Sequence, residues 1–461
     1  MFKEMAQALS MNRIDYLLND PTTPDLKVSL GVPTQSSLRY KVAGWQGKQT
    51  GQAHSLRAGR CYATMATGID YVQTLREKPL KKWAGAPVLK VHPERGKALN
   101  AWYNRKALCF FSKNVPGYGE VYTSDSVDIV AHELGHALLD AQRRDFWSVQ
   151  ALEIWSFHEA YADITAVALL LQHKKVREHV LKETGGDLRK SNAASRLAEQ
   201  VGIAIYHLEN GKGGYYDNCL RDATIKFAYK HPGNLPRNAP HNKLCAECHS
   251  FGRVFLGAWY EIVVGFYELN KKAGQKDSAA LKNACNTAFS YLLKAVTRAP
   301  RVVRFYNAIS SHLLSLFAND PQRFHIVQKV LVDYKLVRPR VKILKAGMNK
   351  VYGSLDDMQQ DRYVHVSRNE TIKLSDHLST DVVQAFAVDK LADVELEIPN
   401  DSYYEFDEQG NLLEEINSTQ EEIVDEARLC AAIIQSTQQV GSEEEKMWEI
   451  ENNRLKRSFV E

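Results

Sequence analysis

The sequence predicts an α+β protein with a β-rich N-terminal lobe, a helical lobe after it and a C-terminal α/β extension. Three observations lead to this division. Short alternating apolar segments fill 87–122, helical apolar spacing dominates from there to about residue 335, and alternating segments return after about residue 340. The expected units are an N-terminal segment, a β-rich lobe ending in a motif-bearing helix, a helical lobe and the extension, at 1–60, 61–145, 146–340 and 341–461.

The β-rich lobe is expected to begin with a helix over 61–77 and to continue with three short strands. Glycine and proline separate these strands, which we place at Val88–Val91, Ala101–Tyr103 and Ala107–Phe111. A helix over roughly 126–141 follows, because the cluster of N-cap residues Thr123–Ser126 precedes an apolar run with helical spacing.

In the helical lobe, apolar spacing predicts helices at 151–173, 193–208, 251–270, 278–297 and 302–318. The intervening 209–249 is rich in Gly, Asn, Pro and His and predicts a long ordered loop, of the kind that lines a site. In the extension, Val394–Ile398 alternates like a strand, Gln409–Asn411 is typical of a hairpin turn, and an acidic, helix-prone segment follows.

Charge is unevenly distributed along a chain of otherwise ordinary globular composition, with 44% apolar and 25% charged residues. Residues 401–461 carry 16 acidic residues and five Lys or Arg, net −11, against net +15 for the rest. This asymmetry indicates an intramolecular contact between the acidic end and the basic body, which could inhibit, or a separate role for the end as a secretion or docking signal. A solvated tail is the third alternative.

Targeting signals are not evident. Charged residues are spread through 1–20, and no apolar run approaches the length that crosses a bilayer, so we expect neither a signal peptide nor a membrane span. The seven cysteines are irregularly spaced, which favours a reducing compartment. A cytoplasmic location is the default expectation, with export by a signal-less route left open, and no nucleic-acid partner is expected.

The strongest chemical motif is His132-Glu133-Leu134-Gly135-His136. Residues four apart lie on one face of a helix, so the two histidines can bind one zinc ion. The glutamate lies one step round the helix, where its carboxylate can reach a water on the metal without binding the metal itself. The alternative is that these are two surface histidines on an ordinary helix that binds no metal.

A third protein ligand would leave one position open for water. The metzincin pattern needs glycine at 139 and histidine at 142, but the chain has Leu139 and Gln142. The segment 157–163 offers Glu159 as the ligand instead, and Asp163, one turn later, can fix the tautomer of a ligand imidazole.

On these residues, the sequence resembles the thermolysin family of gluzincin zinc metallopeptidases, over about residues 85–270. The matching segments follow the family's order and are Asn100–Tyr103, Val127–Ala137, His158–Asp163, Leu220–Asp222 and His249–Phe255. The resemblance implies a two-lobed thermolysin-like fold and a zinc-dependent endopeptidase that acts on peptides or proteins with one catalytic zinc ion.

The resemblance also implies a role for each matching residue. His132, His136 and Glu159 are expected to bind zinc, Glu133 to act as general base, and Asp163 to orient His132. His249 is expected to stabilise the oxyanion, and Arg221 to bind a substrate carbonyl. Asn100 and Ala101 would form the edge strand that pairs with substrate, and Ile129 and Leu220 would line the pocket for the residue after the cleaved bond.

Several positions depart from the family pattern. No tyrosine lies between His136 and Glu159, where the family has one that assists the oxyanion, and His158 replaces the usual asparagine. The acidic cluster that binds paired calcium ions is replaced by Leu169–Leu171 and nearby basic residues, so no structural calcium is expected there.

Cys245-Ala-Glu-Cys248-His249 matches the c-type haem attachment pattern and competes for the same histidine. The two cysteines could instead form a redox pair, belong to a second metal site, or be ordinary thiols. Glu247 is placed to orient His249, or is an ordinary loop residue.

Three further functions remain open. An aminopeptidase of the same class would need a strand of the Gly-x-Met-Glu-Asn type, and the chain has none. A catalytically inactive binding protein on a peptidase fold is favoured only by the missing tyrosine. A haem-binding redox protein rests on the Cys-x-x-Cys-His pattern alone.

Overall fold

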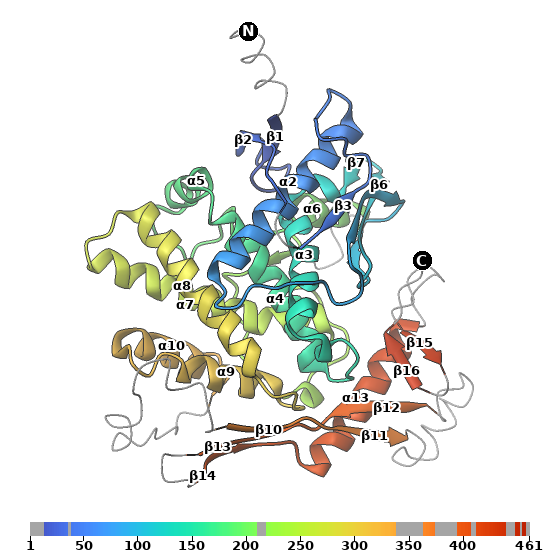
Figure 1. Ribbon diagram of the computed structural model, residues 1–461, viewed down its shortest axis with the longest axis vertical. Helices are drawn as coiled ribbons and strands as arrows, with labels where there is room; N and C mark the ends of the chain where they lie inside the picture. Colours follow the sequence, from blue (N-terminus) through green and yellow to red (C-terminus); the bar gives the residue numbers. More distant parts are fainter. Residues whose placement is uncertain are drawn as a thin grey trace.

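The computed structural model is a mixed α+β structure, about 49% helical and 16% strand, which confirms the α+β part of the predicted fold class. Figure 1 shows the helices gathered at the centre and on one side, the N-terminal sheet on the other, and the C-terminal strands below. The structure describes residues 13–35, 38–209, 218–337, 363–373, 394–406, 412–438, 448–451 and 454–457.

The main N-terminal sheet has the strand order β3-β4-β6-β5, with β7 also paired to β6. Its strands are β3 (Tyr40–Val42), β4 (Leu89–Gly96), β5 (Ala101–Tyr103), β6 (Ala107–Val115) and β7 (Gly119–Tyr122). The three predicted strands are present in it, and β5 ends the order, so the other edge of β5 faces no strand among those described. The edge strand expected beside the site is thus available at β5.

The N-terminal segment, for which no element was predicted, contains three strands among its described residues. The strands β1 (Arg13–Leu17) and β2 (Lys27–Gly31) form an antiparallel hairpin, and β3 joins the main sheet. The helix expected at 61–77 is α2 (Ala53–Leu75), which begins eight residues earlier and crosses the suggested boundary at residue 60. Propensity missed these short strands because tertiary pairing stabilises them.

Helix α4 (Leu152–Leu170) forms the centre of the helical lobe, and every one of its residues is buried. The helices α3 (Val127–Gln142) and α7 (Cys248–Lys272) pack against it. This region also contains α5 (Lys174–Thr184), α6 (Glu199–Leu208), α8 (Asp277–Arg298), α9 (Phe305–Ser315) and α10 (Pro321–Asp333). The helices predicted near 126–141, 151–173, 251–270, 278–297 and 302–318 are confirmed, whereas α5 and α10 were not anticipated.

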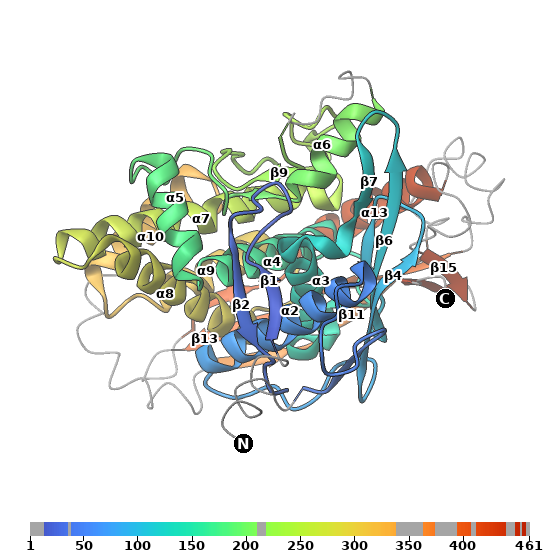
Figure 2. The ribbon, with the colours of Figure 1, turned by 90° about the horizontal axis from the view of Figure 1, so that it is seen from above.

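The helix expected at 193–208 is wrong in its first half. Asn192 accepts hydrogen bonds from the backbone N–H groups of Ala194 and Ser195, which turns the chain, and Ala198 adopts a left-handed conformation with φ of 52°. Local side-chain acceptors of this kind compete with helix formation. Only α6 (Glu199–Leu208) is helical, and it lies beside β6 and β7 (Figure 2).

The predicted loop 209–249 is mostly irregular where the structure describes it, at residues 209 and 218–247, and α7 starts at Cys248. It contributes β9 (Arg221–Asp222), which pairs with β8 (Arg196–Leu197). This short pairing holds the segment carrying Arg221 next to the turn that precedes α6.

The C-terminal extension contains two small sheets and one helix among its described residues. Its elements are β10 (Tyr363–Val366), β11 (Asn369–Lys373), β12 (Glu395–Pro399), β13 (Ser402–Phe406), β14 (Leu412–Ile416), α13 (Gln420–Gln438), β15 (Trp448–Glu451) and β16 (Arg454–Arg457). The strand expected at Val394–Ile398 is β12. The strands β13 and β14 pair antiparallel, and the turn expected at Gln409–Asn411 lies outside the described residues.

The acidic end contacts the basic body through buried ion pairs. Asp401 accepts from Arg301 at 2.8 Å, and Glu426 of α13 lies 3.4 Å from the guanidinium of Arg304. The second carboxylate oxygen of Glu426 accepts the N–H of Leu152, the first residue of α4, at 2.7 Å. The extension is therefore attached to the start of the central helix.

Within the described part of the chain, none of the helices combines the length and the apolarity needed to cross a bilayer.

Candidate metal centre

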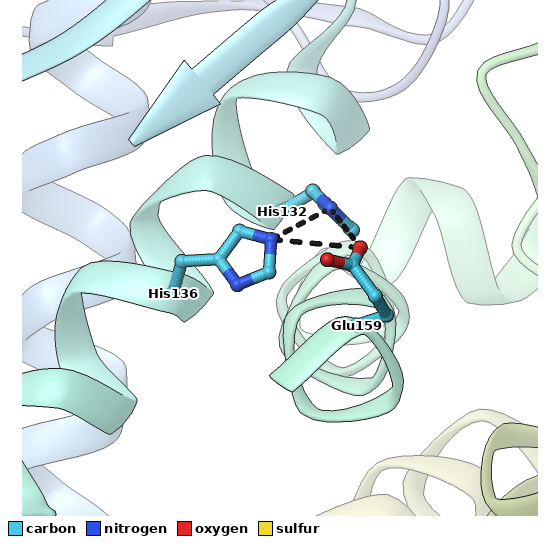
Figure 3. A group of neighbouring side chains, drawn as sticks. All are labelled: His132, His136 and Glu159. Carbon is cyan, nitrogen blue, oxygen red and sulfur yellow. Dashed lines mark hydrogen bonds and ion pairs between the residues drawn. The ribbon is translucent and has the colours of Figure 1, made fainter. Parts of the chain in front are cut away.

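The predicted ligands meet between α3 and α4. His132 Nε2 and His136 Nε2 lie 3.1 Å apart, and Glu159 Oε2 lies 3.4 Å from the first and 3.7 Å from the second. Both rings project from α3 toward the carboxylate on α4 (Figure 3). A tetrahedral zinc ion with bonds of about 2.0–2.1 Å to nitrogen and oxygen separates its ligand atoms by roughly 3.3–3.4 Å. The three donors are thus spaced as a zinc ion requires.

Two glycines let the helices approach closely enough to form this group. A Cβ at Gly135 of α3 would lie 2.7 Å from the Cα of Ala162 on α4, closer than real side chains come. A Cβ at Gly252 of α7 would lie 2.9 Å from the carbonyl oxygen of Ser156 and 3.1 Å from the Cβ of Glu159. Helix α4 is therefore approached closely by both neighbours near its metal-ligand position.

His132 is held by a buried carboxylate. Its Nδ1–H donates to Asp163 at 2.7 Å, which leaves Nε2 directed at the other donors. Burial opposes charge on both groups. Arg221 and His132 nevertheless hold the pKa of Asp163 below its usual range, and Asp163 together with Glu159 raises the pKa of His132 to about 9 against the opposing charge of Arg221. Asp163 therefore occupies the orienting position that was predicted for it.

Arg221 also belongs to this network. Its Nε and Nη2 donate to the two oxygens of Asp163 at 2.7 and 2.8 Å. The residue lines the pocket in front of the candidate centre, so its guanidinium is both anchored and near substrate space. Arg221 could contact a substrate carbonyl, as predicted, only through guanidinium N–H groups that do not bind Asp163.

The carboxylates of Glu133 and Glu159 each have an unsatisfied oxygen. Glu133 Oε2 and Glu159 Oε2 are buried and have no hydrogen-bond partner among the residues described. Such orphaned acceptors are costly unless a cation or water meets them, so the residues present fit a bound metal and its water. Burial raises the pKa of Glu133 to about 7, which suits a group that accepts and returns a proton near neutrality.

His249 lies on the other side of Glu159. Its Nε2 is 3.4 Å from Glu159 Oε2, and its Nδ1–H donates to Glu247 at 2.6 Å, which confirms the predicted orienting role of Glu247. Glu247 also caps α7 by accepting the N–H groups of His249 and Ser250. Burial opposes protonation of His249, but Glu159, Cys248 and Glu247 raise its pKa well above the ordinary value. The ring is half exposed and can donate from Nε2.

The ring of His158 is buried beside the centre. It stacks on His136 with 5.7 Å between ring centroids, in the place where the family pattern has asparagine. His158 therefore provides an aromatic contact behind one candidate ligand.

The pocket in front of the centre brings most of the predicted site residues together. Its predicted lining residues are Asn100, Ala101, Ile129, His132, Glu133, Asp163, Leu220, Arg221 and His249. Its other lining residues are Leu99, Thr123, Asp128, Leu197, Ala198 and Val201, which sequence reasoning missed. Among the residues that the structure describes, neither a tyrosine nor a residue of the extension lines it.

Of these missed residues, Asp128 could most readily have been found from the sequence, because it lies one helical turn before His132. Its carboxylate accepts the N–H groups of Ile129 and Ala198 at 2.8 and 2.7 Å and pairs with Ser126. It thereby ties the turn before α6 to the start of α3. Asp128 shapes the apolar side of the pocket.

The two cysteines of the Cys-x-x-Cys-His segment differ in their surroundings. Both are buried free thiols, but the Sγ of Cys248 lies 3.1 Å from Glu247 and 3.5 Å from His249 Nδ1. Burial raises the pKa of the Cys248 thiol to about 11. Cys248 also packs with Leu152 and residues of α13 in an apolar cluster. The redox-pair and haem interpretations remain predictions.

No protein-family model matches this chain, and no curated protein matches it either.

Proposed function

We propose that this chain is a zinc-dependent endopeptidase with a thermolysin-like arrangement of two lobes about the metal centre. The observation that carries the proposal is the placement of His132, His136 and Glu159, whose donor atoms lie 3.1–3.7 Å apart. Glu133 stands beside them without contributing a ligand atom to the group, in a pocket that reaches the edge strand β5. A metal held by these three residues keeps one coordination position open for water. The site therefore suits hydrolysis better than metal storage or a structural role.

The metal would be held by His132, His136 and Glu159, and when bound it would supply an activated water and polarise the scissile carbonyl. Glu133 accepts the proton of that water and returns it to the leaving amine. Its pKa of about 7 lets the carboxylate act in both directions at neutral pH.

Other side chains position the substrate. His249 donates from Nε2 to the carbonyl oxygen as negative charge develops there, and Glu247 holds the ring in place. An extended peptide would pair with β5 at Asn100 and Ala101, which reads backbone rather than side chains. In the structure the Ala101 N–H donates to Asn100 Oδ1 at 2.9 Å, and a substrate carbonyl could replace this local acceptor.

The apolar side of the pocket favours a bulky apolar residue after the cleaved bond. Ile129 and Leu220 line it, as the resemblance implies, and Leu197 and Val201 extend the same surface. Burying a Leu or Phe side chain there would contribute about 1.5–3 kcal/mol to binding.

The test is digestion of a diverse peptide library by the zinc-loaded protein, with cleavage sites read by mass spectrometry. Glu133→Gln should keep zinc and lose nearly all turnover, whereas His132→Ala should lower the zinc content measured by elemental analysis. Substantial turnover by Glu133→Gln would refute the assignment of the base. Full zinc occupancy in His132→Ala would place the metal elsewhere.

A catalytically inactive binding protein is the second candidate, and the lack of a tyrosine between His136 and Glu159 in the sequence favours it. The same library separates the two, because an inactive protein would retain peptides without cutting them. Release of single N-terminal residues would instead indicate an aminopeptidase, and a visible absorption spectrum would reveal a haem.

A further inference from the structure

The extension shares an apolar core with the two helices that carry Glu159 and His249. This shared core is separate from the main core of the protein. Its members from the body of the protein include Leu152 and Trp155 of α4 and Ala246 and Cys248 at the start of α7. Its members from the extension include Leu396 and Ile398 of β12 and Ile423, Ala427 and Cys430 of α13. The starts of α4 and α7 therefore both pack against the extension.

Hydrogen bonds hold the extension on the segments that lead into the helices. Gln150, two residues before α4, exchanges two hydrogen bonds with Glu397 of β12, at 3.0 and 2.6 Å. Ser418 accepts the N–H of Val303, which precedes α9, at 3.0 Å. Together with the bond from the first residue of α4 to Glu426, these contacts fix where the extension sits relative to the helix starts.

The position of the first turn of α7 depends on the contacts of Glu247 and Cys248. An irregular segment precedes this helix, and the first N–H groups of a helix have no partners within it. Glu247 accepts two of them, and the Cys248 side chain is buried in the shared core. His249, the next residue, has a half-exposed side chain that packing fixes less firmly. The placement of its ring is therefore set by what lies under Cys248.

Glu159 is held more firmly than His249. It lies two turns into α4, and every residue of that helix is buried. A looser extension should thus displace the histidine more than the metal ligand.

An inhibitory tail would have to cover or enter the pocket in front of the metal centre. The described residues of the extension do neither, since none of them lines it. They pack instead on the helix starts that carry the site, which is the arrangement of a support.

We propose that the extension is an activating part of the peptidase, in which Ile423 and the shared core position His249 through Cys248. The inference rests on the proposed peptidase function, where His249 donates to the developing oxyanion. Such donors act at about 2.7–3.1 Å, and a misplacement of about 1 Å can lower the rate roughly 100-fold. Docking of the extension therefore sets the turnover rate without any contact between the extension and the substrate.

The experiment compares two identical substitutions in the full, zinc-loaded chain. Ile423→Ala removes a fully buried side chain from the shared core. Ile14→Ala, the matched control, removes an equally buried one from the main core in β1, at the opposite end of the molecule (Figure 1). Each is made alone and together with His249→Gln. The measurements are kcat, KM, zinc content, and amide hydrogen exchange over residues 247–253 by mass spectrometry.

Ile423→Ala should lower kcat by about 10–100-fold, leave KM and zinc content unchanged, and speed exchange at the start of α7. On top of His249→Gln the same change should cost no more than about twofold, because it acts through the group already removed. Ile14→Ala should change none of these quantities. An equal loss of kcat in Ile14→Ala, an undiminished loss in the His249→Gln background, or unchanged or higher kcat in Ile423→Ala would overturn the inference.

Ile423→Val, which removes a single carbon, decides the matter if Ile423→Ala does not fold. It should give a smaller loss of kcat that is again absent in His249→Gln, and an unchanged kcat would count against the proposal. If the wild type cuts no peptide, the peptidase proposal fails. Hydrogen exchange then still decides the structural claim, because unchanged exchange at the start of α7 in the Ile423 variants would show that the extension does not hold it.

Discussion

Gly135→Ala tests whether the close approach of α3 to α4 creates the candidate metal centre. The added Cβ would lie 2.7 Å from the Cα of Ala162, 3.1 Å from the Cβ of Thr165 and 3.2 Å from the carbonyl oxygen of Ala162. Ordinary contacts begin at 3.4 Å, so the helices must separate by about 0.7 Å at this point. The obstruction is mainly backbone, which cannot rotate away.

Two opposing effects determine the stability of this variant. Overpacking of this kind costs about 1–3 kcal/mol, and alanine in place of glycine in a helix returns about 1 kcal/mol. The free energy of unfolding should therefore fall by at most about 2 kcal/mol, too little to unfold a domain of ordinary stability.

The effect on metal binding should be larger than the effect on stability. Metal–ligand distances tolerate errors of about 0.2 Å, and a separation of α3 from α4 moves His132 and His136 away from Glu159 by more than that. Disturbing ligand orientation typically weakens metal binding by roughly 10–100-fold, and we expect a loss in that range.

The assay is competition for zinc against a chromophoric chelator, with urea unfolding measured on the same samples. Gly257→Ala is the control, because a Cβ at that position of α7 meets the Tyr334 ring at 3.2 Å and the carbonyl oxygen of Ile225 at 3.3 Å, neither of which belongs to α3 or α4. It should leave zinc affinity unchanged. Wild-type zinc affinity in Gly135→Ala, or an equal loss in Gly257→Ala, would refute the reasoning.

Other changes probe the rest of the molecule. His249→Phe should lower kcat about 100-fold with little change in KM, because the donor acts on charge that develops in the transition state. Glu426→Ala removes the buried carboxylate that joins the extension to α4 and should lower the free energy of unfolding by about 3 kcal/mol, whereas the exposed Glu421→Ala should cost less than about 0.5 kcal/mol. Burial lowers the pKa of His173 to about 4, so on acidification the unfolded chain takes up that proton first. The contribution of His173 to the free energy of unfolding should therefore be fully present above pH 6.5, and that free energy should fall by up to about 3 kcal/mol toward pH 4. The fall should be smaller in His173→Gln but not in His179→Gln.

Three outcomes would contradict these predictions. An unchanged kcat in the His249 variant would show that His249 does not stabilise the oxyanion. Equal losses for the two glutamate variants would mean that the extension is not held through the buried carboxylate. An acid profile in His173→Gln identical to that of the wild type would assign the pH dependence to other groups.

The sequence predicted the elements whose signal is local. The N-cap cluster before Val127 and the apolar spacing of α3 and α4 are short-range patterns, so both helices lie within a few residues of their expected positions. The helix expected at 193–208 was wrong in its first half, because Asn192 and Asp128 hold the backbone in a turn that spacing alone does not reveal. The strands β1 and β2 depend on pairing with each other.

The pair His132 and His136 followed from sequence alone, since four residues make one helical turn, and Glu159 and Asp163 followed from the motif downstream. Only the tertiary structure decided how closely the helices approach, and it did so through two glycines that no spacing rule singles out. It also brought Cys248 beside Glu159. Periodicity along one helix is a local property of the backbone, whereas the distance between donors on different helices depends on packing across the whole core.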